Sequence, residues 1–425
     1  MHIKLLKFAD GERFPVLLDD DNSPIFKPTA YTVAMLRPSA GSYRTLLSQL
    51  GGLMVLYIWA QRNGIDIEGR FDGGNFLTLQ EIMNLADDAK RLCKELREEL
   101  EPAPAPAISR IINLEKHRMS ANSRKALFVG PATAAIRLMA IRGYLDWLAL
   151  QHIGKIGRRS DDFAILDAAR QQMTGWLAAR IPHGKKSKTG NIREGLSPEV
   201  QELLLESVAP SSPQNPWKSE FVRFRNQALV RLFLALGPRG GEGLILRVQD
   251  VDLRKSELLI RRAPDDFADP RLWEPNTKTL DRKIPLNEEL TLILEDYILK
   301  HRSKLKGARK HPVLLVADRT GAPLSQSALS KIFRVLREKV PGLPDWLTCH
   351  VCRYTWNDNF SDLADREKTD EELEKRTRAY LMGWTFNSQM PAKYAKRHIK
   401  MKAAKASLDL QNKAFRKKGT QEDEN

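Results

Sequence analysis

The chain has 425 residues, and its 42% hydrophobic content is enough to build cores in two or three domains rather than one. Its 69 Lys and Arg exceed its 53 Asp and Glu, so a formal charge of +16 favours a polyanionic partner, either nucleic acid or an anionic membrane. Three cysteines are too few for a disulfide framework, and the longest apolar stretch, residues 53–60, is too short to span a bilayer. We therefore expect a cytoplasmic protein.

The first 181 residues predict a short hairpin followed by helices. Asp10-Gly11 is a turn signal between two apolar runs, so residues 1–30 are expected to be an N-terminal extension containing a β-hairpin. Residues 31–181 are predicted to form a helical domain, because apolar residues recur there at helical spacing. The expected helices are residues 42–62, 79–100, 132–151 and 162–179. The second of them ends before an Ala-Pro repeat that cannot continue a helix.

Residues 182–197 are expected to be a basic linker. It contains glycines and three lysines, Lys185, Lys186 and Lys188. Its composition leaves two interpretations open, a solvated tether and a tether lying along a phosphate backbone. Ser197-Pro198-Glu199 then has the form of a helix start, with a capping residue, a proline at the first position and an acid in the first turn.

Residues 198–400 are predicted to form a second domain, mostly helical with a small sheet. The hydrophobic pattern changes to period two at two places, which predicts short strands at 257–262 and 282–286. Helices are expected at 217–236, 288–302, 325–339, 350–361, 370–382 and 391–415. The fold class is therefore mainly α with a small antiparallel β-sheet (α+β), and residues 401–425 form a C-terminal helix and tail.

Three local signatures occur in this second region. They are Gly237-Pro238-Arg239-Gly240-Gly241-Glu242, His350-Val351-Cys352-Arg353-Tyr354, and Leu381-Met382-Gly383-Trp384 followed by Tyr394. In this order and spacing the chain resembles the tyrosine recombinases, the phage integrase family of DNA strand-exchange enzymes. The motifs cover residues 195–400, and they imply a tyrosine-recombinase catalytic domain there. The helical region 31–181 resembles the family's SAM-like core-binding domain only in architecture.

The same residues suit phosphodiester chemistry on physical grounds. Attack on a phosphodiester needs a nucleophile, neutralisation of the phosphate charge and an acid for the leaving oxygen. Arg239 and Arg353 are the candidates for gripping the phosphate, because the guanidinium fork binds phosphate oxygens bidentately. His350 and Trp384 can donate further hydrogen bonds. The resemblance makes Tyr394 the nucleophile of a covalent 3′-phosphotyrosyl link, with no ATP, metal or other cofactor.

Two residues complete the predicted site. Lys278 lies between the two expected strands, where the family carries its general-acid lysine, and Lys283 on the same hairpin is a rival. Glu242 is expected to orient Arg239 or His350 rather than to touch DNA. Of the other tyrosines nearby, Tyr354 is expected to pack and Tyr380 to face the core.

The chain departs from the family pattern in three ways. Gly240-Gly241 replaces the usual apolar-Ser pair, which predicts a looser turn at the first arginine. Residues 362–374 form an acidic, charged insertion, and the spacing from Trp384 to Tyr394 is at the long end for the family. None of these changes removes a catalytic group.

The expected partner is double-stranded DNA. Basic runs at 300–310 and 393–418 flank the motifs, and the candidate contacts include Lys393, Lys396 and Arg397. The resemblance implies a homo-tetramer on synapsed DNA and a monomer when free. It also implies docking of the C-terminal segment 403–410 onto a neighbouring subunit, and a place in the bacterial cytoplasm with the nucleoid.

Other functions stay open on the residues alone. The favoured interpretation is a site-specific recombinase or integrase of a mobile genetic element, and the same chemistry could serve resolution or relaxation. From a different class, the chain could be a catalytically inactive DNA-binding accessory or regulatory protein of the same fold. A metal-dependent nuclease would need clustered ligands. Cys349 and Cys352 have CxxC spacing, but no second Cys/His pair nearby completes a zinc site.

Overall fold

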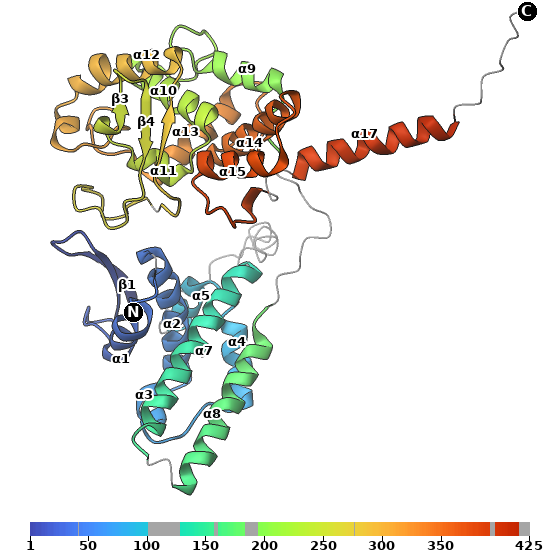
Figure 1. The fold of residues 1–425 in the computed structure, drawn as a ribbon. Helices are drawn as coiled ribbons and strands as arrows, with labels where there is room; N and C mark the ends of the chain where they lie inside the picture. The colour runs from blue at the N-terminus through green and yellow to red at the C-terminus, as the bar shows by residue number, and fades with distance from the viewer. Residues whose placement is uncertain are drawn as a thin grey trace, which may run out of the picture. The chain divides into compact units, whose positions relative to one another are not determined.

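The computed structural model describes residues 1–40, 42–100, 128–156, 160–182, 194–275, 277–391 and 396–415. The chain divides into two compact units, Met1–Lys188 and Thr189–Asn425, each with its own hydrophobic core (Figure 1). Most of the predicted linker, with Lys185, Lys186 and Lys188, lies outside the described residues. In the described ranges, no helix has the length and apolar content that a membrane crossing requires.

The first unit begins with an antiparallel hairpin and continues as helices. Strands β1 (His2–Lys7) and β2 (Arg13–Leu18) pair from His2↔Leu18 to Lys7↔Arg13, and Leu17 enters the core. The helices are α1 (Phe26–Tyr31), a π-helical turn (Thr32–Leu36), α2 (Tyr43–Arg62), α3 (Ile67–Asp72), α4 (Leu79–Asp88), α5 (Cys93–Glu98), α7 (Pro131–Ile153) and α8 (Asp161–Arg180).

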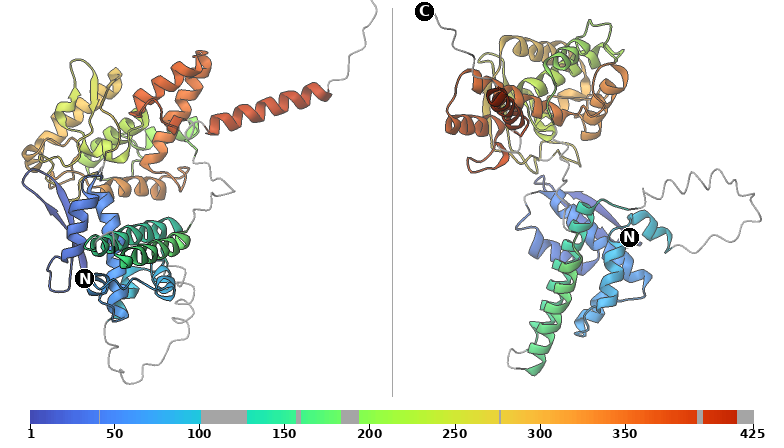
Figure 2. Two further views of the ribbon diagram at one scale, coloured as in Figure 1. Left: turned by 60° about the horizontal axis from the view of Figure 1, so that its bottom comes forward. Right: turned by 90° about the vertical axis from the view of Figure 1, so that its right-hand side faces the viewer.

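The core of the first unit forms where α2 meets α7. Gly52 lets the two helices approach closely, because a Cβ there would lie 2.8 Å from the carbonyl oxygen of Arg137. Leu53, Leu56 and Ile141 are fully buried at this contact. Helix α8 packs along α7 (Figure 2) and adds Met173 and Leu177 to the same core, so the predicted helices at 42–62, 132–151 and 162–179 are confirmed.

The single helix predicted for 79–100 is wrong. Helix α4 ends at Asp88, and α5 starts only at Cys93. Between them the backbone pairs elsewhere: Arg91 forms a β-bridge with Phe128, and the carbonyl of Lys90 accepts a hydrogen bond of 2.8 Å from Val129. These tertiary hydrogen bonds replace the i→i−4 bonds of a continuous helix.

The second unit combines helices with a three-stranded antiparallel sheet of order β3-β4-β5. The strands are β3 (Val251–Asp252), β4 (Glu257–Ile260) and β5 (Arg282–Pro285). The helices are α9 (Pro198–Ser207), α10 (Glu220–Leu236), α11 (Gly240–Ile245), α12 (Glu288–Asp296), α13 (Gln326–Lys339), α14 (Cys349–Arg366), α15 (Glu371–Met382) and α17 (Lys396–Phe415). The predicted fold class, mainly α with small antiparallel sheets, is confirmed, although β3 and α11 were not expected.

Local signals explain several boundaries in this unit. Ser197 caps α9 as predicted, since its side chain accepts a bond from the backbone of Val200. Much of the acidic stretch 362–374 is helical, because α14 runs on to Arg366 and Asp370 caps α15. Arg378 then bridges these two helices while fully buried, bonding to Ser361 and to Glu374.

Gly237 ends α10 in a left-handed conformation, with φ of 58°, and directs the chain into the first arginine motif. A Cβ at this position would also lie 2.9 Å from Cβ of Trp356. We predict that Gly237→Ala destabilises this unit by about 1–2 kcal/mol through backbone strain, and by more through the clash. Calorimetry should show the transition of residues 189–425 at a lower temperature.

Gly51→Ala is the matched control. Gly51 lies within α2, and a Cβ added there meets nothing within 4 Å. This substitution should stabilise the first unit by up to about 1 kcal/mol. Equal effects of the two substitutions would contradict the assigned role of Gly237.

Candidate active site

The first arginine motif sits where α11 meets α13 and α14. Arg239 occupies the N-cap of α11 with extended backbone. A Cβ on Gly240 would lie 3.2 Å from Nε2 of Gln326 and 3.3 Å from Sγ of Cys349, so a glycine permits this close approach. The looser turn predicted from Gly240-Gly241 is wrong, since the turn is closely packed.

Glu242 is the buried centre of the site. Its Oε2 accepts a bond of 3.0 Å from the backbone N–H of Arg239 and one of 2.8 Å from Nη2 of Arg282. Its Oε1 accepts from the hydroxyl of Thr279 and lies 3.5 Å from Nη1 of Arg239. Burial raises the pKa of this carboxyl, but Arg282 and Arg353 outweigh burial, so the pKa lies below its usual value. Glu242 is therefore a fixed anion that contacts Arg239.

Arg353 joins three segments of the site while fully buried. Its Nη1 donates to the carbonyl of Gly237 at 2.8 Å, and its Nη2 donates to the carbonyl of Met382 at 3.1 Å. Its guanidinium carbon lies 5.3 Å from the ring centre of Trp384. The phosphate contact of Arg353 stays a prediction.

His350 precedes Arg353 in the sequence, and Trp384 follows it. His350 is half-buried, one helical turn before Arg353 on α14, and its ring meets that of Tyr354 edge-on at 5.0 Å. Trp384 is buried with Tyr354 and Met382, just after Gly383 ends α15 with a φ of 65°. The packing predicted for Tyr354 is thereby confirmed.

The prediction for Tyr380 is wrong. Its side chain is 51% exposed rather than facing the core, because it lies over the sheet edge and its hydroxyl donates to the carbonyl of Lys283 at 3.3 Å.

Lys278 is exposed on the segment that leads into β5, between the buried Thr277 and Thr279. Thr279 bonds to Glu242, and the N–H of Leu280 donates to the carbonyl of Gly383 at 3.0 Å. Lys278 is thus adjacent in sequence to Thr279, whose hydroxyl bonds to Glu242. Its rival Lys283 is also exposed, on the outward side of β5. The preference for Lys278 stays a prediction.

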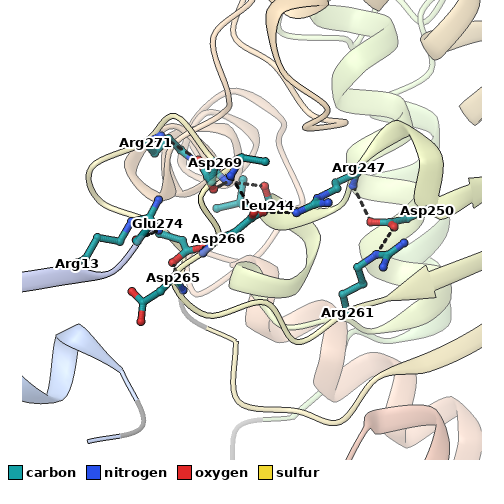
Figure 3. Close-up of polar contacts among 12 residues, drawn as sticks. Arg13, Leu244, Arg247, Asp250, Arg261, Asp265, Asp266, Asp269, Arg271 and Glu274 are labelled. Atoms are coloured by element: carbon teal, nitrogen blue, oxygen red, sulfur yellow. Dashed lines mark hydrogen bonds and ion pairs between the residues drawn. The ribbon is translucent and has the colours of Figure 1, made fainter. Parts of the chain in front are cut away.

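The long loop between β4 and β5 is anchored to the body of the unit by arginines (Figure 3). Arg271 donates to the carbonyls of Leu244 at 3.0 Å and Leu324 at 2.7 Å. Glu274 accepts bonds from two backbone N–H groups of the same loop, at 2.9 and 3.0 Å. Arg261, at the start of the loop, pairs with Asp250 at 2.5 Å. These contacts therefore fix the course of the loop ahead of Lys278 and of Thr279, which bonds to Glu242.

Tyr394 and Lys393 lie outside the described residues, and the side chains of Lys396 and Arg397 at the start of α17 lie outside them too. Met390, four residues before Tyr394, packs against the cluster that contains Trp384. The chain leading to Tyr394 thus starts beside the site.

Sequence reasoning missed Arg282 and Thr279. Both are buried and both bond to Glu242. A signal for Arg282 was present: it shares the inward side of the expected strand with Ile284 and Leu286. An arginine at an inward strand position needs a buried acceptor, and Glu242 supplies it.

The CxxC pair, Cys349 and Cys352, lies at the start of α14. Burial raises the pKa of the Cys349 thiol to about 11 and raises that of Cys352 further. Among the described residues, no three His, Cys, Asp or Glu side chains gather as a metal would require.

Comparison with known proteins finds similarity to integrases and recombinases. Residues 213–400 match the family model described as the phage integrase family. The protein y4rF of Sinorhizobium fredii (strain NBRC 101917 / NGR234), assigned by name as an integrase/recombinase, is 33% identical over 225 residues. That alignment covers 48% of this chain and 49% of the relative, so the chain spans about half the length of the curated relative it matches.

Solved structures with low sequence identity also match. The XerH site-specific recombinase bound to a palindromic difH substrate is 15% identical, with a TM-score of 0.44 over 83% of this chain and 95% of that chain. XerA recombinase is 15% identical, with a TM-score of 0.37 over 77% and 97%. The Tn1549 transposon integrase in complex with transposon right end DNA is 16% identical, with a TM-score of 0.39 over 78% and 99%.

We predict that Glu242→Gln destabilises the second unit by about 3 kcal/mol or more at neutral pH, because it leaves Arg282 buried without its counter-charge. Since folding lowers the pKa of Glu242, its contribution is present above the unfolded carboxyl's pKa and is lost as pH falls through the folded value. The difference in unfolding free energy between wild type and variant should therefore become smaller in acid, below about pH 4. Denaturant unfolding at several pH values measures it.

Glu289→Gln is the control for this prediction, because it breaks an exposed ion pair with Arg231 on the same unit. The expected change is below about 1 kcal/mol. The central role of the carboxylate would be contradicted if Glu242→Gln destabilised the unit as little as Glu289→Gln does. It would also be contradicted if the destabilisation by Glu242→Gln became larger in acid.

Proposed function

We propose that the chain is a site-specific DNA recombinase, in line with the match of residues 213–400 to the phage integrase family. It cleaves and rejoins DNA strands through a covalent 3′-phosphotyrosine intermediate, and it is encoded by a mobile genetic element, which it recombines. The observation that carries this proposal is the arrangement around Glu242: the carboxylate contacts Arg239, while Arg353 ties the same turn to the Trp384 segment.

In the proposed reaction the phosphate binds first. Arg239 has 28% of its side chain exposed and is oriented by Glu242, so its fork can bind the non-bridging oxygens. Arg353 adds a second positive charge, and His350 and Trp384 can donate hydrogen bonds where negative charge develops. Orientation of the phosphate is the part of catalysis that these residues supply before any bond breaks.

The bond changes then follow in one displacement. The phenol of Tyr394 gives up its proton to water, its oxygen attacks phosphorus, and the bond from phosphorus to the 5′ oxygen breaks. Lys278 gives its proton to the leaving 5′ oxygen, producing a free hydroxyl. Attack of a 5′ hydroxyl on the phosphotyrosyl link reverses these steps and rejoins a strand. The link conserves the bond energy, so ATP is not needed.

Double-stranded DNA is the proposed partner, and both units are proposed to contact it. The net charge of +16 supplies affinity for the phosphate backbone, with candidate contacts from the linker lysines and from Lys393, Lys396 and Arg397. The helical region 31–181 would act as the core-binding domain. Binding through phosphates fixes position and register, whereas base contacts would select the site. Bacterial cytoplasm with the nucleoid is the compartment this proposal implies.

A suicide DNA substrate, nicked near the cleavage point, tests the proposal. We expect the wild-type protein to become covalently attached to the DNA 3′ end, since the short fragment beyond the nick diffuses away and cannot religate. Tyr394→Phe should reduce attachment by at least about 10⁴-fold, because the nucleophile is lost. Electrophoresis under denaturing conditions separates attached from free DNA, and gel shifts in native conditions confirm that the variant still binds.

The same assay separates the enzyme from an inactive accessory protein. Wild type that binds DNA without attaching to it would overturn the recombinase proposal and support the accessory function. Attachment through a residue other than Tyr394 would overturn the assignment of the nucleophile.

We further propose that the active assembly is a homo-tetramer on synapsed DNA, built through the C-terminal helix. The side chains at 402–413 of α17 are all exposed, including Leu408 at 58% and Leu410 at 67%. The second unit has an apolar hollow of about 520 Å³. It is lined mainly by Leu205, Leu234, Leu290, Ile293, Trp356 and Phe360. Segment 403–410 of a second copy is the proposed occupant, since burial of both leucines would be favourable.

Removal of residues 403–425 should impair synapsis of two duplexes far more than cleavage of one, because the proposed site does not use these residues. Native gels of paired duplexes measure the first, and the suicide substrate measures the second. Replacing Leu408 and Leu410 together by Asn is the matched variant, since it retains the basic charge of α17. An equal loss of synapsis and cleavage would contradict the docking proposal.

A further inference from the structure

Arg282 lies at the junction between the hairpin and the two signature segments, and no motif assigned it a role. It is almost fully buried, and its donors are spread over three acceptors from different parts of the chain. Nη2 donates to Glu242 at 2.8 Å, Nε donates to the carbonyl of Leu381 at 2.7 Å, and Nη1 donates to the carbonyl of Leu280 at 3.4 Å. One planar guanidinium thus joins α11, the end of α15 and the segment that carries Lys278.

The segments around Arg282 are in close contact. A Cβ on Gly383 would lie 2.5 Å from Nη1 of Arg282 and 2.9 Å from the carbonyl oxygen of Leu280, so only glycine fits. The N–H of Leu280 donates to the carbonyl of Gly383 at 3.0 Å. This hydrogen bond and the Arg282 bonds hold residues 279–282 against residues 381–383.

Lys278 itself is exposed, so its reach toward a phosphate is set by its backbone rather than by packing of its side chain. The next residue, Thr279, bonds to one oxygen of Glu242, and Arg282 bonds to the other. Because Glu242 also contacts Arg239, the backbone that bears the lysine and the turn that bears the arginine share one buried carboxylate.

We propose that Arg282 is a positioning residue that sets the place of Lys278 relative to the Arg239 turn. The proposal rests on the proposed function, in which Lys278 is the proton donor to the leaving oxygen. Arg282 does not touch the DNA. A lysine at this position could not replace it, since a single ammonium lacks the planar fork that reaches both Glu242 and the carbonyl of Leu381.

A positioning role makes a specific chemical prediction. A proton donor is needed because the 5′ alkoxide is a poor leaving group. A substrate with sulfur in place of the bridging 5′ oxygen leaves as a thiolate and needs no proton, because thiols ionise near pH 8.5. Misplacement of Lys278 should therefore slow cleavage of the oxygen substrate alone. Damage to the phosphate grip or to the fold should slow both substrates.

The experiment compares single-turnover cleavage of matched oxygen- and sulfur-bridged suicide substrates. We expect Arg282→Met and Arg282→Lys to slow oxygen-substrate cleavage about 100-fold, within the usual contribution of a general acid, and to slow the sulfur substrate less than about 3-fold. Lys278→Met should show the same selective pattern. Arg378→Met is the matched control: it removes another buried arginine, bonded to Ser361 and Glu374, and should slow both substrates equally if it slows either.

Equal slowing of both substrates by Arg282→Lys and Arg282→Met would overturn the positioning role. So would selective slowing by Lys278→Met with no effect of either Arg282 variant. If Arg282→Met does not fold, Arg282→Lys and Thr279→Val carry the comparison, since each removes only part of the bonding around Glu242.

Hydrogen exchange gives a readout that does not depend on activity. Exchange of the Leu280 amide, which bonds to Gly383, should accelerate at least about 10-fold in Arg282→Lys, because the segment opens more often. Unchanged exchange would overturn the proposal even if wild type cleaved neither substrate. Failure of wild type on both substrates would instead count against the recombinase function itself, so the two failures are distinguishable.

Discussion

The structure of the second unit depends on one buried carboxylate. Glu242 is inaccessible to water, and it accepts hydrogen bonds from the backbone of Arg239, from Thr279 and from Arg282. An ion in such a place is tolerated only when its oxygens are satisfied by charged or polar donors. The three partners come from two separate stretches of chain, so satisfying the carboxylate also fixes where these stretches lie. The geometry of the site follows from this electrostatic requirement.

The buried ion pair of Glu242 and Arg282 contributes to the specificity of the fold more than to its net stability. Desolvation of both ions offsets much of their attraction, so the folded state gains little compared with an apolar pair of similar size. Removing one partner is nevertheless costly, because the other charge stays buried. This asymmetry means that alternative packings of the hairpin are strongly disfavoured, which suits a segment that bears an exposed lysine.

The sequence was sufficient for much of the fold because most helices carry their own signals. Helix α2, for example, has apolar residues at helical spacing, and Ser197-Pro198 marks the start of α9. The sequence-based predictions failed where tertiary contacts determine the local structure. The bridge from Arg91 to Phe128 interrupts a helix that periodicity alone would continue, and the packing of Gly240 against Gln326 and Cys349 cannot be read from a local turn pattern.

The candidate site was predictable only where residues stand in spaced motifs. Short patterns single out Arg239, His350, Arg353 and Trp384 as candidates, and Tyr354 was correctly expected to pack. Arg282 and Thr279 belong to no such pattern. Their roles arise from pairing with Glu242, about forty residues earlier in the chain, and hydrogen bonds across such a distance leave no local signal except an arginine on the inward side of a strand.

The two signature arginines are physically unequal, and this bears on how the site would work. Arg353 is buried and donates to carbonyls at the C-terminal ends of α10 and α15, where the helix dipole favours a cation. Arg239 is partly exposed, and within the described part of the chain Glu242 is the group that pairs with it. Arg353 therefore builds the frame as well as adding charge, whereas Arg239 has the accessible fork. Because Glu242 feels the charge of both Arg282 and Arg353, the hairpin and the frame are coupled through the same anion.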